Sequence, residues 1–139
     1  MLTKKIMAKS ILCPIDFSES SLEALKWATE LSSMLNCHLS VLYPYRLLQT
    51  SKNDVTDLKK KNEEQAAKKF AAVEKSHLKG KDISFDFSAE VGFLDDRVEY
   101  HLKKNHILMM VISKSMNNRN KENPEDFIDQ SDVPVLVVP

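Results

Sequence analysis

The order of secondary structure is set by residues 10–43, which read SILCPIDFSESSLEALKWATELSSMLNCHLSVLY. The segment opens with a short apolar run that ends in a carboxylate at Asp16, which is typical of a strand buried on both faces of a sheet. Ser20 and Glu23 have the spacing of a capping box, and apolar residues follow at helical intervals up to a stop near Asn36. The segment closes with a second short, β-prone run. These patterns predict a strand, a helix and a strand.

The rest of the chain continues this alternation. We expect a strand over 38–43 that ends at Pro44, because proline has no amide hydrogen for the ladder. The further predicted elements are a long amphipathic helix over 55–77 stopped by Gly80, an edge strand over 83–88, a helix over 94–104, an apolar central strand over 106–113 and a last strand over 133–138. Before the last strand, we expect residues 114–123 to be irregular and Phe127 and Ile128 to lie on a short helix.

Five predicted strands separated by four predicted helices define an α/β fold. Right-handed crossovers between such strands build a parallel sheet, so we predict three layers with a doubly wound sheet in the middle. The chain has 139 residues, and we expect residues 1–139 to form a single domain. Ligands of such sheets bind beyond the carboxyl ends of the strands, where the strand order reverses. The candidate site therefore lies in the loops after Asp16, Tyr43 and Ser113.

Charge and hydropathy argue against several classes of partner. The chain has 20 Lys and Arg residues and 20 Asp and Glu residues, so no overall field draws it to nucleic acid or to an anionic membrane. The longest apolar run, Ile107 to Ile112, is far below the roughly 20 residues that span a bilayer. Charged residues interrupt the N-terminal apolar segment, which argues against a signal peptide and favours a cytoplasmic protein. Cys13 and Cys37 lack CxxC spacing, and we expect buried, reduced thiols.

Glycine is scarce in this chain. Average usage of about 7% would give roughly ten glycines, whereas the sequence contains only 2, Gly80 and Gly92. A loop whose backbone amides converge on a phosphate usually needs glycine, because a Cβ atom blocks the close approach. The composition therefore argues against a nucleotide site before any motif is considered.

Three motifs, taken in order, resemble the universal stress protein family over essentially the whole chain. The first is Ile11 to Ser18, where a Pro-x-Asp-x-Ser pattern follows an apolar pair, and the others are a glycine turn at 90–94 and the closing strand at 133–139. The resemblance implies the five-stranded architecture of adenine nucleotide alpha hydrolase-like proteins, with strand order 3-2-1-4-5. It also implies a homodimer through the last strand, and a second copy would pair the unpaired backbone groups of such an edge. The expected interface residues are Val135, Leu136, Val137 and Val138.

The family divides into members that bind ATP and members that do not. The nucleotide-binding members carry Gly-x-x-Gly, a spacer of nine residues and Gly-Ser or Gly-Thr after the fourth strand. The early glycine positions fall here near Val111 and Lys114, the late pair falls near residues 121–122, and no glycine follows Gly92. Side chains would occupy the space where amides must wrap a triphosphate. The resemblance therefore indicates a dimeric, non-enzymatic stress-response or regulatory module with no cofactor, no metal and no catalytic residue.

The alternative is a diverged ATP-binding member with weak or no ATP hydrolysis. In that case the resemblance places Pro14, Ile15 and Asp16 at the nucleoside and Ser113 and Ser115 at the phosphates. Asp16 also has a structural interpretation, in which a strand-terminal carboxylate hydrogen-bonds loop amides and steadies the following turn. A third and more distant possibility is a protein that binds flavin or another adenosine cofactor on a related architecture.

Other conspicuous residues have ordinary explanations. Helix capping accounts for Ser18 and Ser20 better than nucleophilic catalysis, because neither lies in a Gly-x-Ser-x-Gly elbow. The four histidines form no metal motif. The apolar and aromatic segment from Tyr43 to Leu48 follows a strand, so it either covers the site, contacts a protein partner, or packs on its own domain.

Overall fold

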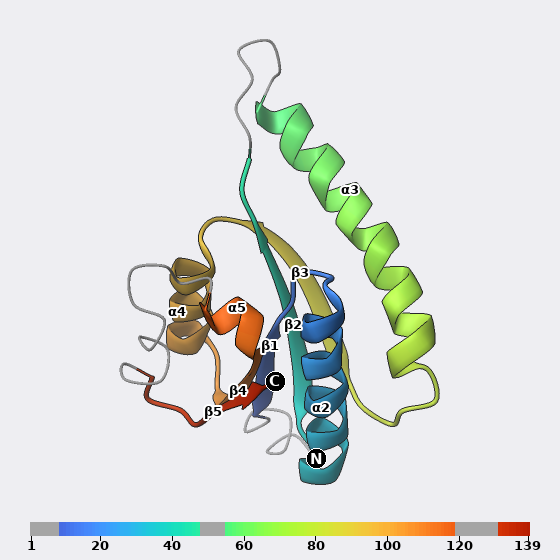
Figure 1. Cartoon of the computed structure of the whole chain (residues 1–139), viewed down its shortest axis with the longest axis vertical. Helices are drawn as coiled ribbons and strands as arrows, with labels where there is room; N and C mark the ends of the chain where they lie inside the picture. The colour runs from blue at the N-terminus through green and yellow to red at the C-terminus, as the bar shows by residue number, and fades with distance from the viewer. Residues whose placement is uncertain (1–8, 48–54, 119–130) are drawn as a thin grey trace.

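The chain folds around a five-stranded sheet in the order β3-β2-β1-β4-β5, in which all neighbouring strands are parallel (Figure 1). A computed structural model describes residues 9–47, 55–118 and 131–139. The strands are β1 (Ser10–Pro14), β2 (His38–Tyr45), β3 (Phe85–Val91), β4 (Ile107–Ser113) and β5 (Val135–Val138). The predicted α/β class, parallel sheet and strand order are therefore confirmed.

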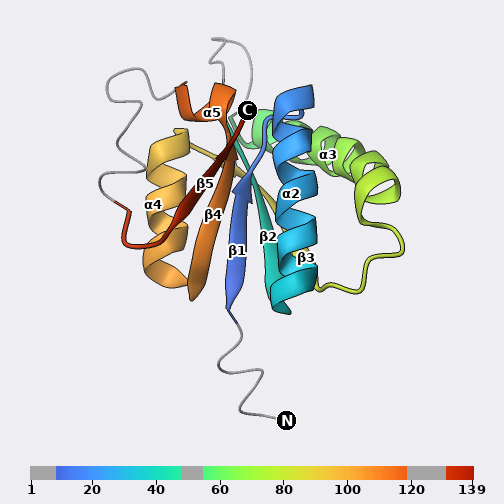
Figure 2. The ribbon, with the colours of Figure 1, turned by 60° about the horizontal axis from the view of Figure 1, so that its bottom comes forward.

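Helices cover both faces of the sheet. One face carries α2 (Glu19–Leu35) and α3 (Val55–Val73), which continues into the π-helix η1 (Glu74–Leu78), and the other face carries α4 (Leu94–Lys104) (Figure 2). Ile11 packs in one core with residues of α2, while its neighbour Leu12 packs in a second core with Val98 of α4. The first strand is therefore buried on both faces, as its continuous apolar run predicts. None of the described helices combines the length and hydropathy that a membrane span requires.

Ser18, rather than Ser20, caps helix α2. Ser18 has φ and ψ values of −71° and 159°, and its hydroxyl accepts a hydrogen bond from the Ser21 amide at 3.2 Å. The predicted capping box is therefore wrong in position, because the turn after β1 leads into the helix sooner than the Ser20 and Glu23 pattern suggests. The predicted stop is confirmed, since Asn36 adopts a left-handed conformation with φ 55°.

Pro44 does not end β2, which continues to Tyr45. Pairing between β1 and β2 ends at Pro14 and Leu42, and the Leu42 carbonyl accepts from the Ile15 amide at 2.8 Å. Backbone groups of alternate residues point to the same side, so position 44 also points toward β1, which has already turned away. The missing amide hydrogen of Pro44 therefore costs no ladder bond, and β2 goes on pairing with β3 alone.

Two further predicted boundaries are corrected. The edge strand β3 spans Phe85–Val91 rather than 83–88. It pairs with β2 from Leu39 to Tyr45, and this pairing sets its length. The start of the segment predicted to be irregular is instead the short helix α5 (Lys114–Asn118), whose Met116 amide donates to the Ser113 hydroxyl at 3.2 Å. The predicted short helix at Phe127 and Ile128 lies outside the described residues.

Candidate functional site

The carboxyl ends of β1 and β4 meet where the sheet reverses its strand order. From β1 the chain continues to β2 on one side, and from β4 it continues to β5 on the other. Ligands of doubly wound sheets bind at this position. We call its polar residues the switch-point site, which comprises Asp16, Ser18, Ser20, Ser113 and Ser115.

Asp16 organises the turn between β1 and α2. Its Oδ1 atom accepts a hydrogen bond from the Ser18 amide at 3.0 Å and a second bond from the Ser18 hydroxyl. The Asp16 amide donates to the Ser21 hydroxyl at 3.2 Å. A side-chain oxygen that binds the backbone two residues later is an Asx turn. These contacts agree with the structural interpretation of Asp16.

An aromatic residue occupies the tip of this turn. Phe17 has a left-handed backbone with φ 63°, which is uncommon for a large side chain. Its ring lies edge-on to Tyr43, with 4.9 Å between the ring centroids. Tyr43 in turn stacks on Tyr45, which is buried, at a centroid distance of 5.9 Å. Both tyrosines therefore pack on their own domain, whereas Leu48 lies outside the described residues.

A chain of serine hydroxyls joins the two sides of the switch-point site. Ser18 Oγ lies 3.3 Å from Ser20 Oγ, which is 2.7 Å from Ser115 Oγ. Ser115 Oγ is in turn 3.3 Å from Ser113 Oγ. Each hydroxyl is able to donate and to accept, so neighbouring serines can serve as partners for one another, and Ser18 links the series to the Asp16 carboxylate. Ser113 and Ser115 are predicted from the sequence to lie here, but their contact with Ser20 is not, because no local pattern indicates it.

Side chains fill the start of the segment that would wrap a triphosphate. Strand β4 passes into α5 without an intervening loop residue. Val111 is fully buried in the sheet, and Met116 and Asn117 are also buried. The Ser113 hydroxyl already accepts the Met116 amide, so this amide is engaged within the turn. Residues 121 and 122, where the second glycine pair would stand, lie outside the described residues.

The structure brings together some of the predicted nucleotide residues but not all. Pro14 and Ile15 are buried, and the Ile15 side chain is part of the core beneath the sheet. Only backbone groups of these two residues could contact a ligand. Asp16, Ser113 and Ser115 do lie at one edge, with Ser113 buried and Ser115 exposed. Their roles in binding remain predictions.

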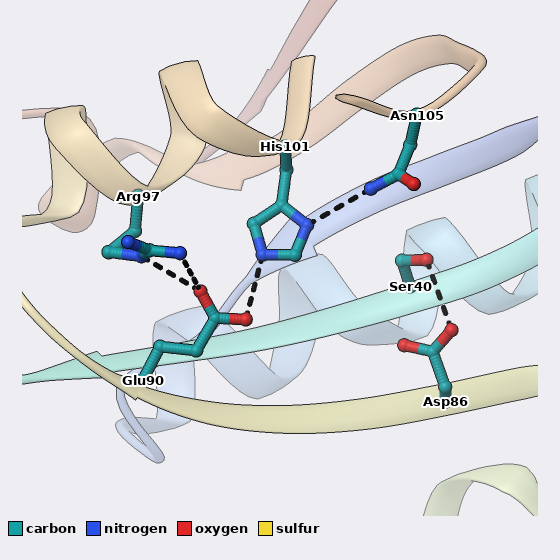
Figure 3. Close-up of polar contacts among 6 residues, drawn as sticks. All are labelled: Ser40, Asp86, Glu90, Arg97, His101 and Asn105. Carbon is teal, nitrogen blue, oxygen red and sulfur yellow. Dashed lines mark hydrogen bonds and ion pairs between the residues drawn. The ribbon is translucent and has the colours of Figure 1, made fainter. Parts of the chain in front are cut away.

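A second polar cluster, which the sequence analysis does not identify, ties the edge strand β3 to helix α4 (Figure 3). The Glu90 carboxylate accepts hydrogen bonds from Arg97 Nε and His101 Nε2, each at 2.8 Å. Arg97 Nη2 lies 2.8 Å from Oε1, the carboxylate oxygen that also accepts from Nε. Asn105 Nδ2 lies 3.3 Å from His101 Nδ1. The spacing of Arg97 and His101, four residues apart on one helix, is the only sequence signal for this cluster.

The contacts of Glu90 favour its ionised form. Partial burial opposes ionisation of the carboxylate, but hydrogen bonds from His101, Ser88 and Arg97 outweigh that effect. The pKa of Glu90 therefore lies below its ordinary value. Arg97 also lies over the Tyr100 ring, with its guanidinium carbon 4.4 Å from the ring centroid. We assign this cluster a structural role, because it holds α4 against the edge of the sheet.

A serine, a histidine and an aspartate also meet at the opposite, amino end of β2 and β3. His38 Nδ1 is 2.8 Å from Ser84 Oγ, and His38 Nε2 is 2.7 Å from Asp86 Oδ2. Ser40 adds a longer contact to Asp86 at 3.4 Å. The Asp86 side chain is 60% exposed, so water competes for each of these contacts. We interpret this group as a polar cross-strand cluster on a solvent-exposed part of the sheet.

The described residues hold no group of three or more His, Cys, Asp or Glu side chains that could bind a metal ion. Both cysteines are free, with Cys13 buried and Cys37 partly exposed. Burial raises the pKa of the Cys13 thiol, which therefore stays protonated and unreactive. The prediction of full burial is thus wrong for Cys37, because it follows the end of α2 at the surface.

The strand order defines a doubly wound α/β protein, and the five polar residues of the switch-point site lie where that order reverses. A family model described as the universal stress protein family matches residues 7–139. The chain belongs to the universal stress protein family, as the three sequence motifs indicate. No curated protein matches it by sequence.

Solved structures of the family share this fold. A universal stress protein from Lactobacillus plantarum has a TM-score of 0.74 at 15% identity, covering 94% of this chain and 97% of its own. A family member from Burkholderia pseudomallei has a TM-score of 0.73 at 18% identity, covering 96% and 97% of the two chains. The universal stress protein from Archaeoglobus fulgidus in complex with dAMP has a TM-score of 0.62 at 16% identity, covering 96% and 99%.

Proposed function

We propose that this universal stress protein is a non-enzymatic stress-response or regulatory module that acts as a cytoplasmic homodimer and binds no ATP. In this proposal it requires no cofactor and works by contact with a protein partner. Its even balance of 20 basic and 20 acidic residues supports a partner other than nucleic acid or a membrane surface.

The passage from β4 into α5 is the observation that carries this proposal. A triphosphate needs several bare amides that converge on its oxygens. The first turn after β4 instead presents Lys114 and Ser115 to solvent and buries Met116. The Met116 amide is already paired with the Ser113 hydroxyl. Because no glycine follows Gly92, the later part of this segment also lacks the residue that permits close approach.

The engagement of the polar groups at the switch-point site supports a non-enzymatic role. The Asp16 carboxylate accepts two bonds from Ser18, which lowers its availability as a base for an attacking water. Within the described part of the chain, the hydroxyls of Ser20, Ser113 and Ser115 contact serines and the Met116 amide, and none contacts a histidine that would activate it. Only Ser18 bonds a carboxylate, that of Asp16, and the Ser18 hydroxyl also caps helix α2. This arrangement is suited to holding the loops in place.

The position of β5 at the edge of the sheet supports a dimer through that strand. The Met110 amide donates to the Pro134 carbonyl at 2.9 Å, so the backbone groups of Pro134, Leu136 and Val138 point toward β4. The amides and carbonyls of Val135 and Val137 consequently point to the outer edge. A second β5, running antiparallel, would pair these four groups and close the assembly as a two-fold dimer.

One observation favours the alternative, a diverged ATP-binding protein with weak or no hydrolysis. Asp16, Ser113 and Ser115 do lie at one edge of the sheet, and a fold neighbour has been solved with dAMP. A nucleoside monophosphate needs fewer phosphate contacts than ATP. Binding of dAMP without binding of ATP would therefore agree with loss of the triphosphate-binding loop alone.

Calorimetric titration of the full chain with ATP and Mg²⁺ tests the proposal. We expect no saturable heat up to roughly 1 mM ATP, where binding would contribute only about 4 kcal/mol. Phosphate release should equal that of buffer. Saturable micromolar binding that is lost in Asp16→Ala, but kept in the matched variant Asp86→Ala at the other end of the sheet, would replace the proposal with the alternative.

A further inference from the structure

Helix α2 carries large apolar side chains on its solvent side. Trp27 is 52% exposed, Met34 is 77% exposed and Leu35 is 50% exposed, and Leu31 is partly buried between them. Residues three, four and seven positions apart lie on one side of a helix, so the four side chains form a continuous strip. We call them the α2 stripe (Trp27, Leu31, Met34 and Leu35). A cluster of this kind on a soluble protein indicates an interaction surface.

The α2 stripe lies on the side of the helix that faces β4 and β5. Ser20 is seven residues before Trp27 and therefore shares its side, and Ser20 hydrogen-bonds Ser115 of α5, just beyond β4. Leu31 packs against the same core as Leu136 of β5. Helix α2 lies on the face of the sheet opposite to α4 (Figure 2). From the Ser20 contact and helical spacing, we infer that the stripe is on the side of α2 nearer to β5.

Strand β5 is an edge strand, and among the described residues the outward backbone groups of Val135 and Val137 have no strand partner, which suits pairing with an identical strand. A two-fold axis that pairs two such edges in antiparallel fashion is perpendicular to the sheet. Both copies of α2 then lie on the same face. Leu136 would face Leu136 of the partner subunit across the axis, because positions between the hydrogen-bonded pairs bring their side chains closest together.

We propose that a second copy of this chain covers the α2 stripe, so that the two stripes pack toward each other above the Leu136 pair. This inference rests on the proposed dimer through β5 and names the second surface that this dimer buries. The β5 pairing alone joins two strands of four residues each, which is a small contact. The stripe supplies the apolar area that such a short strand pair lacks.

The size of the exposed side chains suits this geometry. Helix α2 lies over β1 and β4, so the two copies of α2 would be about four strand spacings apart, roughly 19 Å. Helices in direct contact are about 8–10 Å apart, so the two backbones would not touch. Only long side chains can fill a gap of that width. Trp27 and Met34 are among the longest apolar side chains available, and they lie on the facing sides.

Sedimentation equilibrium of the full chain and of surface variants tests this inference. We expect Trp27→Ala and Met34→Asp each to raise the dimer dissociation constant about 30-fold, the effect typical of a central interface residue. Phe93→Ala is the matched control, because Phe93 is 53% exposed, close to the 52% of Trp27, and lies at the start of α4 on the other face. The control should leave the dissociation constant within about twofold of the unmodified chain. Unchanged far-ultraviolet circular dichroism would show that each variant folds.

Fluorescence adds a readout in the unmodified chain, since Trp27 is the only tryptophan. Its emission should shift to shorter wavelength as the concentration rises through the dimerisation midpoint. Leu136→Arg should abolish both the dimer and this shift.

The outcomes separate the inference from the proposed dimer. A stable dimer that Leu136→Arg dissociates, but that Trp27→Ala and Met34→Asp leave unaltered, would overturn the role of the stripe and keep the β5 dimer. A monomer at roughly 100 μM would overturn both, because it would exclude even weak pairing at that concentration.

Discussion

Replacement of Glu90 by glutamine tests the cluster that fastens α4 to the edge of the sheet. The Gln side chain keeps the shape of Glu but is neutral, and its amide group presents donors to Arg97 or His101, which are donors themselves. The wild-type carboxylate is 22% exposed and accepts three contacts of 2.8 Å from these two residues. Partly exposed, charge-assisted bonds of this kind suggest a loss of about 2 kcal/mol in unfolding free energy.

Urea denaturation at neutral pH measures this loss directly. The matched control is Glu99→Gln, because Glu99 forms an ion pair with Lys103 at 2.7 Å in which both side chains are more than 60% exposed. An exposed pair on one helix contributes only about 0.3–0.5 kcal/mol. If Glu90→Gln destabilised the protein no more than Glu99→Gln, the structural role of the cluster would be refuted.

The effect of Glu90→Gln should also depend on pH. The folded-state pKa of Glu90 is lowered from its ordinary value of 4.5. A lowered folded pKa means that the carboxylate contributes stability above the unfolded pKa, and that this contribution is lost as the pH falls through the folded pKa. The difference between wild type and Glu90→Gln should therefore be full at pH 7 and should shrink below about pH 4.5.

Three substitutions and one labelling reaction test other local features of the fold. Gly92→Ala should destabilise the fold by about 1–3 kcal/mol in urea denaturation, because Gly92 has φ +144° and a Cβ atom there would lie 2.8 Å from Arg97 Cδ; a neutral result would contradict this. Ser18→Ala should cost about 1 kcal/mol through loss of the cap, and Ser20→Ala less than half of that; equal losses would restore the capping box. Only one thiol should react with a disulfide reagent in the native protein, because Cys13 is buried and protonated; fast labelling of both would show that the first strand opens.

The fold could be predicted from the sequence because its strands are buried on both faces and its helices are amphipathic. The run from Ile11 to Ile15 is apolar throughout, and burial of both its faces follows directly. The boundaries that failed depend on tertiary context. Whether Pro44 ends β2 is decided by where β1 stops, and whether residues after Ser113 are helical is decided by a side-chain cap.

The switch-point site was harder to predict from the sequence than the fold was. The motif at Asp16 located one side of the switch point, and the end of the apolar run at Ser113 located the other. The contact between Ser20 and Ser115 joins residues that are far apart in the chain, and serine is too common to mark it. The Glu90 cluster was missed for the same reason, since its acceptor and its donors come from different elements.

We propose that side chains, rather than the exposed backbone amides of glycines, occupy the place where a triphosphate would lie at the start of the segment after β4. Titration of the full chain with ATP and Mg²⁺, followed by calorimetry, tests this claim most directly. We expect no saturable binding in the micromolar range. A single saturable transition with micromolar affinity and a stoichiometry near one per chain would contradict it.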